Sequence, residues 1–159
     1  MDLSVVPAAV PHKDMDLPNV VEVLQDLKPE TERILALTLE ELELEAPRII
    51  PQYQLPSDEF IGTLNVKQKM DVLRGCLLVY VLSKGKAVPR DFQLQTCLGP
   101  LDGRDTVLCS GTGSGKTLVL ILLLLLRPND ISLLVVPLKR LQLVQVNILN
   151  FCGSPCSRS

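Results

Sequence analysis

Hydrophobic residues recur with helical spacing in the middle of the chain. Between positions 66 and 81 they follow one another at intervals of three or four, at Val66, Met70, Leu73, Leu77 and Val81. This spacing places them on one face of an α-helix. We expect the helix to end before Gly85, because glycine accepts the backbone conformation that often stops a helix.

Prolines and glutamates dominate the chain before this helix. We expect Asn19 to cap a short helix through Leu27, and Glu30 to Glu45 to form an acidic helix with one apolar face. The first 18 residues hold three prolines without a hydrophobic period, which predicts a loose tail. Three further prolines between Ala46 and Pro56 predict a linker.

Two short apolar runs flank a leucine-rich segment in the C-terminal half. Thr106 to Cys109 and Ile131 to Val136 favour buried strands, and Leu118 to Leu126 between them favours a buried helix. Two such strands joined by a helix are typical of a parallel sheet with a right-handed crossover. The expected fold class is therefore α/β, with a parallel βαβ unit preceded by an α-helical N-terminal region.

These patterns divide the chain into three parts. We expect an acidic, partly helical and flexible region over residues 1–56, a helical segment over 57–86 and an α/β domain over 87–159. Within the last part, short helices are also expected from Pro89 to about Pro100 and from Pro137 to Phe151.

A glycine-rich run joins the first expected strand to the leucine-rich helix. Its sequence is SGTGSGKT, and its residues are Ser110, Gly111, Thr112, Gly113, Ser114, Gly115, Lys116 and Thr117. Small residues let the backbone curl so that its N–H groups point inward, and the next helix adds its positive N-terminal end. This Walker A-type pattern predicts a phosphate-binding loop, with Ser110 where the general motif has glycine. A chance Gly-Ser turn is the alternative.

Two side chains of this motif carry the expected chemistry. Lys116 would reach the β- and γ-phosphates of a nucleotide, and Thr117 would place its hydroxyl on a Mg²⁺ ion that bridges them. We therefore expect ATP and Mg²⁺ as cofactors, with Lys116 and Thr117 as candidate catalytic residues.

Composition limits the class of protein. Hydrophobic residues make up 47% of the 159 residues and aromatic residues only 3%, so the core must be aliphatic. The longest apolar run, Leu118 to Leu126, has nine residues, whereas a bilayer-spanning helix needs about 20. The first residues also lack the pattern of a signal peptide. We expect an intracellular protein without a membrane anchor.

Charge is distributed unevenly along the chain. Residues 1–59 carry 13 acidic and 4 basic side chains, whereas residues 60–159 carry 5 acidic and 12 basic ones. A basic half that contains a phosphate loop fits a polyanionic partner in addition to the nucleotide. The acidic helices either contact a protein partner or only neutralise the basic half.

Disulfides and zinc are not expected. The cysteines are odd in number and lie among apolar neighbours, which favours reduced, packed thiols at Cys76, Cys97, Cys109, Cys152 and Cys156. Cys152 and Cys156 lack the two further ligands of a tetrahedral zinc site, and the only histidine, His12, lies in the proline-rich tail.

The segment from Val88 to Gly153 resembles a known family. It contains a Phe-Gln segment, a Gly-Arg-Asp turn, the phosphate loop and the run LLVVPLKRLQLVQV in that order. This order is similar to the first part of superfamily 2 helicases, specifically RecQ-like DNA helicases of the DEAD/DEAH-box kind. The resemblance implies a RecA-like P-loop domain, ATP-dependent action on nucleic acid, with DNA favoured over RNA, and a nuclear location.

The resemblance also assigns roles to single residues. It implies that Gln93, 17 residues before the phosphate loop, recognises the adenine edge, and that Lys139 and Arg140 contact nucleic-acid phosphates. This sequence departs from the family where Ser-Pro-Leu and Asp-Gln-Val are replaced by Val136-Pro137-Leu138 and Val144-Gln145-Val146.

Other family elements are missing from the sequence. No Asp-Glu-x-Asp/His motif follows the phosphate loop, and no second lobe supplies an arginine to the transferring phosphate. Because such an arginine contributes about 10³ to 10⁵ in rate, we expect this chain alone to hydrolyse ATP poorly or not at all. The ending Phe151 to Ser159, with its glycine, proline and serines, suggests a fragment or a truncated product.

The sequence leaves three functions open. The first is the ATP-binding and nucleic-acid-binding portion of a RecQ-like ATP-dependent DNA helicase. The second is a noncatalytic ATP-binding or interaction module derived from a helicase. The third, a small P-loop kinase or nucleotide switch, gives no role to the glutamine segment or to the stretch after the second expected strand.

Overall fold

The computed structural model describes residues 20–130 except 110, 112 and 129, with side chains from residue 28 onward. All regular elements in this part of the chain are helices. They are α1 (Val20–Ala36), α2 (Leu39–Ile49), the short 3₁₀ helix η1 (Gln52–Gln54), α3 (Asp58–Gly62), α4 (Val66–Leu82), α5 (Asp91–Leu101) and α6 (Lys116–Leu126).

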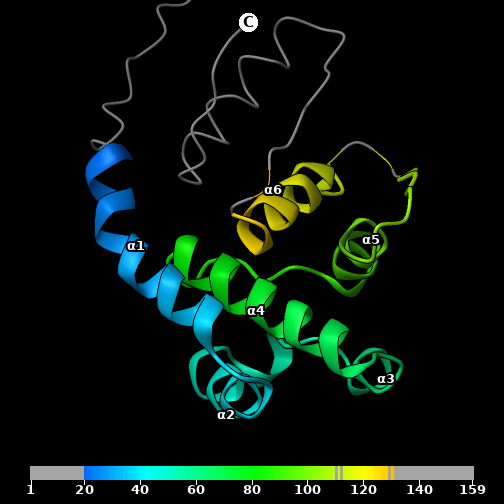
Figure 1. Ribbon diagram of the computed structural model, residues 1–159, viewed down its shortest axis with the longest axis horizontal. Helices are drawn as coiled ribbons and strands as arrows, with labels where there is room; N and C mark the ends of the chain where they lie inside the picture. Colours follow the sequence, from blue (N-terminus) through cyan, green and yellow to red (C-terminus); the bar gives the residue numbers. More distant parts are fainter. Residues whose placement is uncertain (1–19, 110, 112, 129, 131–159) are drawn as a thin grey trace, which may run out of the picture.

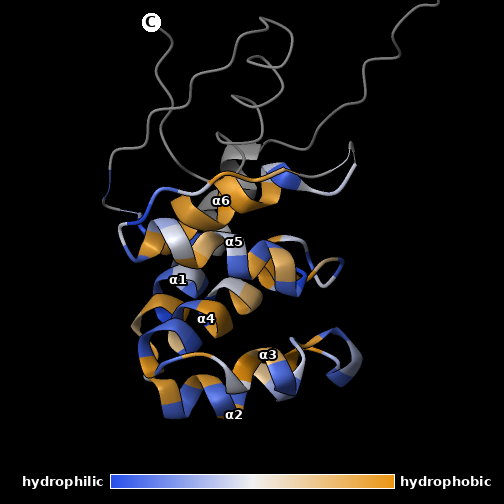
Figure 2. Ribbon diagram, turned by 90° about the vertical axis from the view of Figure 1, so that its right-hand side faces the viewer, coloured by the Kyte–Doolittle hydropathy of each residue, from blue (hydrophilic) through white to orange (hydrophobic). Residues whose placement is uncertain are grey.

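Helix α4 lies at the centre of this arrangement. It contacts α1, α2, α5 and α6, whose ribbons surround it in Figure 1. Figure 2, turned by a quarter, shows α2 and α3 on one side of α4 and α6 on the other. Because α4 lies between them, it sets the relative positions of the acidic N-terminal helices and of the helix that follows the predicted phosphate loop.

The periodicity predicts α4 correctly, but its burial is broader than one face. The helix spans Val66–Leu82 and ends before Gly85, as expected. Val72, Cys76, Leu77 and Leu78 are all at most 2% exposed, whereas Val66, which belongs to the expected apolar face, is 68% exposed. Consecutive buried positions are typical of a helix with neighbours on several sides.

Helices α5 and α6 pack on α4 and on each other. Gly75 of α4 lies at this junction, where an added Cβ would be 3.1 Å from Leu122 of α6 and 3.8 Å from Leu94 of α5. The thiol of Cys97 in α5 donates to the carbonyl oxygen of Val119 in α6 at 3.5 Å. This packing confirms the buried helix that the leucine-rich run predicts.

Two of the three cysteines among the described residues are buried, as expected, and one is not. Cys76 and Cys97 are free thiols in the core, and burial raises the pKa of Cys97 to about 12. Cys109 is also free but exposed, contrary to the expectation of a packed thiol. Cys152 and Cys156 lie outside the described residues.

The boundaries of the N-terminal helices differ from those expected. α1 continues through Pro29, and α2 begins after Thr38. The Thr38 hydroxyl accepts from the N–H of Glu41 at 3.4 Å, and the Glu41 carboxylate accepts from the N–H of Thr38 at 2.8 Å. This reciprocal capping starts a new helix inside the segment expected to be continuous, and the Thr-x-x-Glu pattern is its sequence signal.

The expected linker also begins inside a helix. α2 extends to Ile49, so the segment from Ala46 is helical at first. Ala46 and Ile50 are at most 1% exposed. Their burial explains why the prolines do not form a loose connection here.

The expected α/β fold is wrong for the described residues. The segment from Thr106 to Cys109 forms no strand, and Val107 within it is 89% exposed. A strand needs a neighbour for its backbone hydrogen bonds, and the described residues contain none. The apolar side of α6 is covered by α4 and α5 instead of a parallel sheet, so neither a βαβ unit nor a RecA-like core is present in this part of the chain.

Several expectations fall on residues outside the described part of the chain. They concern the tail over residues 1–18, the second strand over 131–136 and the helix over 137–151. None of the described helices has both the length and the apolar character needed to cross a membrane. The described side chains also form no group of three or more histidine, cysteine, aspartate or glutamate residues suited to a metal ion.

We predict that Gly75→Leu lowers the free energy of unfolding by about 1–3 kcal/mol, because the added atoms overlap Leu122. Gly75→Ala is the matched control. It adds one carbon against the flexible tip of Leu122 and gains up to about 1 kcal/mol of helix propensity. Urea unfolding measures both variants. A leucine variant as stable as the wild type would contradict the close packing of α4 against α6.

Candidate functional site

The predicted phosphate loop leads directly into α6. Gly115 is the N-cap residue of this helix. Gly113 and Gly115 have φ angles of 83° and 81°, in the left-handed region that favours glycine. The N–H of Ser114 donates to the carbonyl oxygen of Gly111 at 3.4 Å. The chain therefore turns sharply before the helix. Ser110 and Thr112 lie outside the described residues.

The first turn of α6 carries the two candidate catalytic residues. The Lys116 ammonium donates to the carbonyl oxygen of Gly111 at 2.7 Å, so it lies back over the preceding loop. Thr117 is half-buried in the same turn. Because the first N–H groups of a helix have no partners within it, this end of α6 carries partial positive charge. The lysine and the helix end thus place positive charge together.

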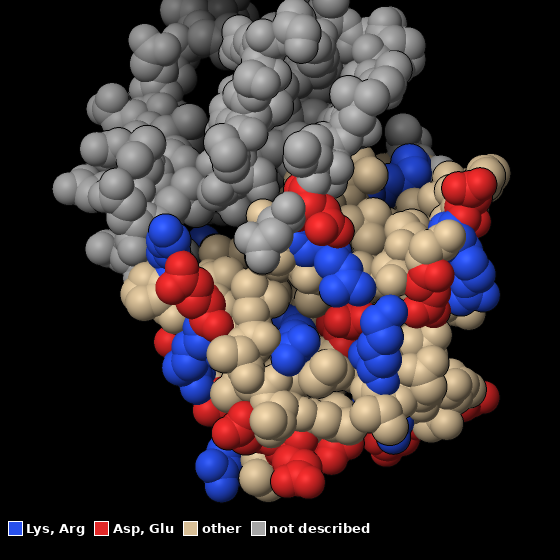
Figure 3. Space-filling model, in the orientation of Figure 1, with Lys and Arg blue, Asp and Glu red and all other residues tan. Residues whose placement is uncertain are grey.

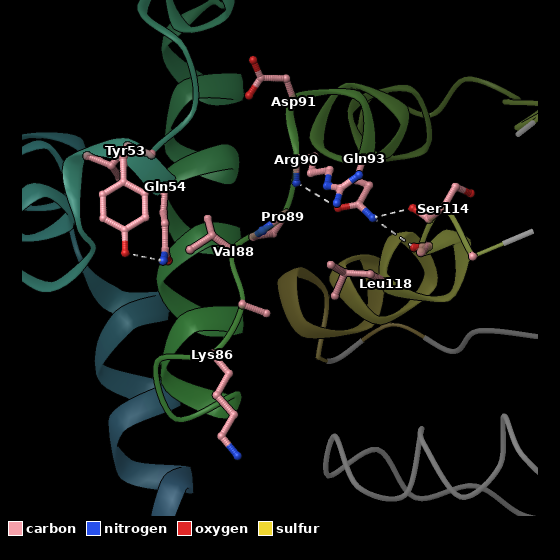
Figure 4. A pocket seen from close by; sticks show the side chains of 14 residues that line it. Tyr53, Gln54, Lys86, Val88, Pro89, Arg90, Asp91, Gln93, Ser114 and Leu118 are labelled. Carbon is pink, nitrogen blue, oxygen red and sulfur yellow. Dashed lines mark hydrogen bonds between the residues drawn. The ribbon is translucent and has the colours of Figure 1, made fainter. Parts of the chain in front are cut away.

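The side chain of Gln93 joins α5 to this loop (Figure 4). Its Nε2 donates to the carbonyl oxygens of Ser114 and Gly115 at 3.1 and 3.2 Å, and its Oε1 accepts from the N–H of Arg90 at 2.9 Å. Gln93 is only 4% exposed. A Cβ at Gly115 would lie 2.5 Å from Nε2, so this close approach requires glycine.

These contacts add a role for Gln93 that sequence reasoning missed. The structure brings the amide to the backbone of the phosphate loop, 21 and 22 residues further along the chain. Nothing in a single sequence marks such a pair. Recognition of adenine by the same amide stays a prediction, and it would require Gln93 to serve the loop and a ligand together.

A cavity of about 660 Å³ lies beside the loop. In Figure 4, Val88 and Pro89 lie between Tyr53 on one side and Gln93 and Ser114 on the other. The cavity is lined by Tyr53, Gln54, Leu55, Lys86, Ala87, Val88, Pro89, Arg90, Asp91, Gln93, Gly113, Ser114, Gly115 and Leu118. The segment after α4 thus connects the phosphate loop with η1.

A second long-range contact joins the segment after η1 to the start of α5. The Ser57 hydroxyl donates to the Asp91 carboxylate at 2.7 Å and accepts from the N–H of Phe60 at 3.3 Å, which caps α3. Asp91 is in the first turn of α5, two residues before Gln93. Ser57 and Asp91 are 34 residues apart and on opposite sides of α4 in sequence, so local patterns give no signal for their contact.

The uneven charge of the sequence is visible on the surface. Figure 3 shows mainly acidic side chains along the lower edge, where α2 and α3 lie, and basic side chains interspersed with acidic ones across the middle of the same face. Exposed acidic residues of α2 include Glu40, Glu41 and Glu43. The acidic surface is therefore carried by helices other than those that form the candidate site.

Comparison with known proteins gives one match. Residues 90–158 match the sequence model of the DEAD/DEAH box helicase family. The match spans under half of the chain and includes Gln93, the phosphate loop, Lys139 and Arg140, the last two outside the described residues. It supports the helicase superfamily for this segment without distinguishing a RecQ-like member. No curated protein and no solved structure matches the chain significantly.

We predict that Gln93→Ala weakens the binding of ATP and of inorganic tripolyphosphate together, because the loop carbonyls lose their shared donor. Gln95→Ala, which removes an exposed amide from the same helix, is the matched control. Calorimetric titration of both ligands measures the effect. Unchanged affinity for both would show that the loop does not depend on Gln93.

The same titrations with GTP test the predicted adenine contact. An amide both donates and accepts, which fits the adenine edge. If Gln93 also recognises adenine, the ratio of ATP to GTP affinity falls toward one in Gln93→Ala. A ratio equal to that of the wild type would leave Gln93 with its role in the loop alone.

Proposed function

We propose that this chain provides the ATP-binding and nucleic-acid-binding portion of a RecQ-like ATP-dependent DNA helicase. The observation that carries the proposal is the turn of Gly113 to Gly115 into α6, with Lys116 over it and Gln93 behind it, inside the segment that matches the helicase family. The nuclear location belongs to the same proposal and rests on the resemblance.

The chemistry of the loop supports a nucleotide triphosphate as the ligand. Two glycines with positive φ alternate with Ser114 before a helix N-terminus, and such turns direct backbone N–H groups toward anions. A phosphate group would replace the Gly111 carbonyl oxygen as the partner of the Lys116 ammonium. Because a phosphate is charged, that hydrogen bond would be the stronger one.

The donor set also fits a Mg²⁺ ion that arrives with the phosphates. Mg²⁺ prefers oxygen ligands and is usually held by phosphate oxygens, water and one or two protein groups. Thr117 offers a hydroxyl in the first turn of α6, next to Lys116. We assign this hydroxyl to the metal, which supplies charge neutralisation at the bridging phosphates when bound.

Hydrolysis by this chain alone should be weak. The sequence has no Asp-Glu-x-Asp/His motif after the phosphate loop, and positioning of the attacking water depends on such groups. The second candidate function is a noncatalytic ATP-binding or interaction module, which the exposed acidic surface of α2 favours. In that case the exposed acidic side chains of α2, including Glu40 and Glu43, contact a protein partner.

We predict that Lys116→Ala lowers the affinity for ATP at least tenfold, because one charge-assisted contact contributes about 1.5–3 kcal/mol. Titration of a fluorescent ATP analogue against both proteins measures the change. Lys28→Ala removes an equal charge from an exposed position on α1 and should bind like the wild type. Equal affinity of Lys116→Ala and the wild type would remove the loop from the nucleotide site.

A further prediction concerns the nucleic-acid contact. If Lys139 and Arg140 bind phosphates, replacing both with alanine should reduce the slope of log affinity against log salt for a single-stranded oligonucleotide by up to about 1.4, or ~0.7 for each lost contact. Affinity measured at several salt concentrations gives the slope. Lys28→Ala combined with Arg48→Ala controls for net charge. An identical slope in the Lys139/Arg140 double variant and in the wild type would exclude these residues from the contact.

A further inference from the structure

Helix α4 carries a buried carboxyl group where it meets α5 and α6. Asp71 is 6% exposed, although aspartates are almost never buried to this extent without a partner. Among the described residues, no group makes a hydrogen bond or an ion pair with this carboxyl group. Because an ionised carboxylate without a donor is costly to bury, this position favours the neutral acid.

The surroundings of Asp71 are mainly apolar. It lines a cavity of about 10 Å³, which is space for about one water molecule. The other lining residues are Val72 of α4, Leu94, Cys97, Leu98 and Leu101 of α5, and Leu122 and Leu126 of α6. The thiol of Cys97 donates to the carbonyl oxygen of Val119 and not to Asp71. The cavity therefore cannot replace the water that an ionised carboxylate loses on burial.

Three cations that act on Asp71 are each held by another group. Nζ of Lys67 donates to the carbonyl oxygen of Leu101 at 3.3 Å, and Nη2 of Arg127 reaches the same oxygen at 3.5 Å. Nη2 of Arg74 donates to a carbonyl oxygen between α1 and α2 at 2.7 Å. Their charges favour the ionised form of Asp71 without a direct contact.

Burial outweighs these charges. It has the largest influence on Asp71 and raises the pKa above the ordinary value of an aspartate. Arg127 has the next largest influence and lowers the pKa together with Lys67 and Arg74, whereas Asp102 raises it. The folded chain therefore holds the proton at pH values at which the unfolded chain has lost it.

We propose that Asp71 is a proton-dependent switch beneath α6. With its proton, the carboxyl group allows α5 and α6 to pack closely on α4. Loss of the proton weakens the packing of α6 and lowers the affinity of the phosphate loop for nucleotide. The second effect rests on the proposed ATP-binding function, whereas the first does not.

Helix α6 connects the two effects. Lys116 of the phosphate loop is its first residue, and Arg127 follows its last residue. An ionised Asp71 gains a donor only if Arg127 leaves the carbonyl oxygen of Leu101 or if water enters between the helices. Either change disturbs the C-terminal end of the helix whose N-terminal end carries the loop.

Proton uptake on folding gives the direction of the pH dependence. From the ordinary pKa of an aspartate, about 3.9, up to the raised pKa of Asp71, stability falls as the pH rises, by up to about tenfold in the unfolding equilibrium for each pH unit. The pKa values of Glu30, Glu41 and Asp102 are lowered by hydrogen bonds, so these groups act in the opposite direction. The contribution of Asp71 is therefore isolated by comparing variants.

The test measures urea unfolding of the full-length wild type and of Asp71→Asn between about pH 4 and pH 8. Asparagine is neutral throughout, so the variant should become more stable relative to the wild type as the pH rises, by up to about tenfold in the unfolding equilibrium for each pH unit. Glu43→Gln, which removes an exposed carboxylate from α2, is the control and should follow the wild type. Equal pH dependence of the wild type and Asp71→Asn would overturn the proposal.

A second variant keeps Asp71 in place. Arg127→Gln removes the cation that acts on it most strongly, so this variant should lose more stability than the wild type as the pH rises. A pH dependence identical to that of the wild type would contradict the part assigned to Arg127.

Titration of MgATP over the same pH range tests the connection with the loop. The affinity of the wild type relative to Asp71→Asn should fall as the pH rises. A constant ratio would exclude transmission from Asp71 to the loop. If neither protein binds ATP, the proposed function fails, while the unfolding measurements still decide whether Asp71 is a switch.

Discussion

The candidate site depends on the hydrogen bonds from the Gln93 amide to the carbonyl oxygens of Ser114 and Gly115. A turn of glycine and serine residues has large conformational freedom, and ordering each residue costs about 1–2 kcal/mol. The buried amide offsets part of this cost, because it joins the turn to α5 while the N–H of Arg90 holds its other end. The absence of a Cβ at Gly115 makes the approach possible.

The helices behind the turn supply its rigid support. α5 and α6 pack against each other and against α4, with Gly75 at their junction. The Ser57–Asp91 hydrogen bond then joins the start of α5 to the segment that contains η1. The cavity is therefore lined by parts of the chain that are far apart in sequence, and α4 contacts α1, α2, α5 and α6.

The sequence predicts the helices with the clearest hydrophobic patterns and the glycine-rich motif. It does not predict the structure of segments whose conformation depends on tertiary contacts. The spacing of apolar residues gives α4 with nearly correct ends, and the leucine-rich run gives α6, since both patterns are long and bury much surface. The run from Thr106 to Cys109 is too short to distinguish a strand from an exposed connection, and Val107 lies in the solvent. The expected break between Leu27 and Glu30 is absent: α1 is continuous through Pro29.

The site shows the same division. The phosphate loop is singled out by its glycine spacing, which is a local property of the sequence, and Gln93 is singled out by the family resemblance. The Ser57–Asp91 and Gln93–Ser114 contacts and the part of Tyr53 in the cavity are not, because each requires the packing of α4 and α5. A motif thus identifies candidate residues in the sequence, whereas the contacts of those residues and the lining of the cavity are known only from the fold.

The most direct test of this account is a titration of MgATP into the isotopically labelled wild-type chain, followed through the backbone amide signals by nuclear magnetic resonance. If the turn binds phosphate, the amide signals of Gly113, Gly115 and Lys116 and the side-chain amide signal of Gln93 shift along one binding curve and reach saturation at the same nucleotide concentration. Signals of exposed residues on α2, such as Glu43, should stay in place. Saturating nucleotide without any shift in the turn would contradict the account.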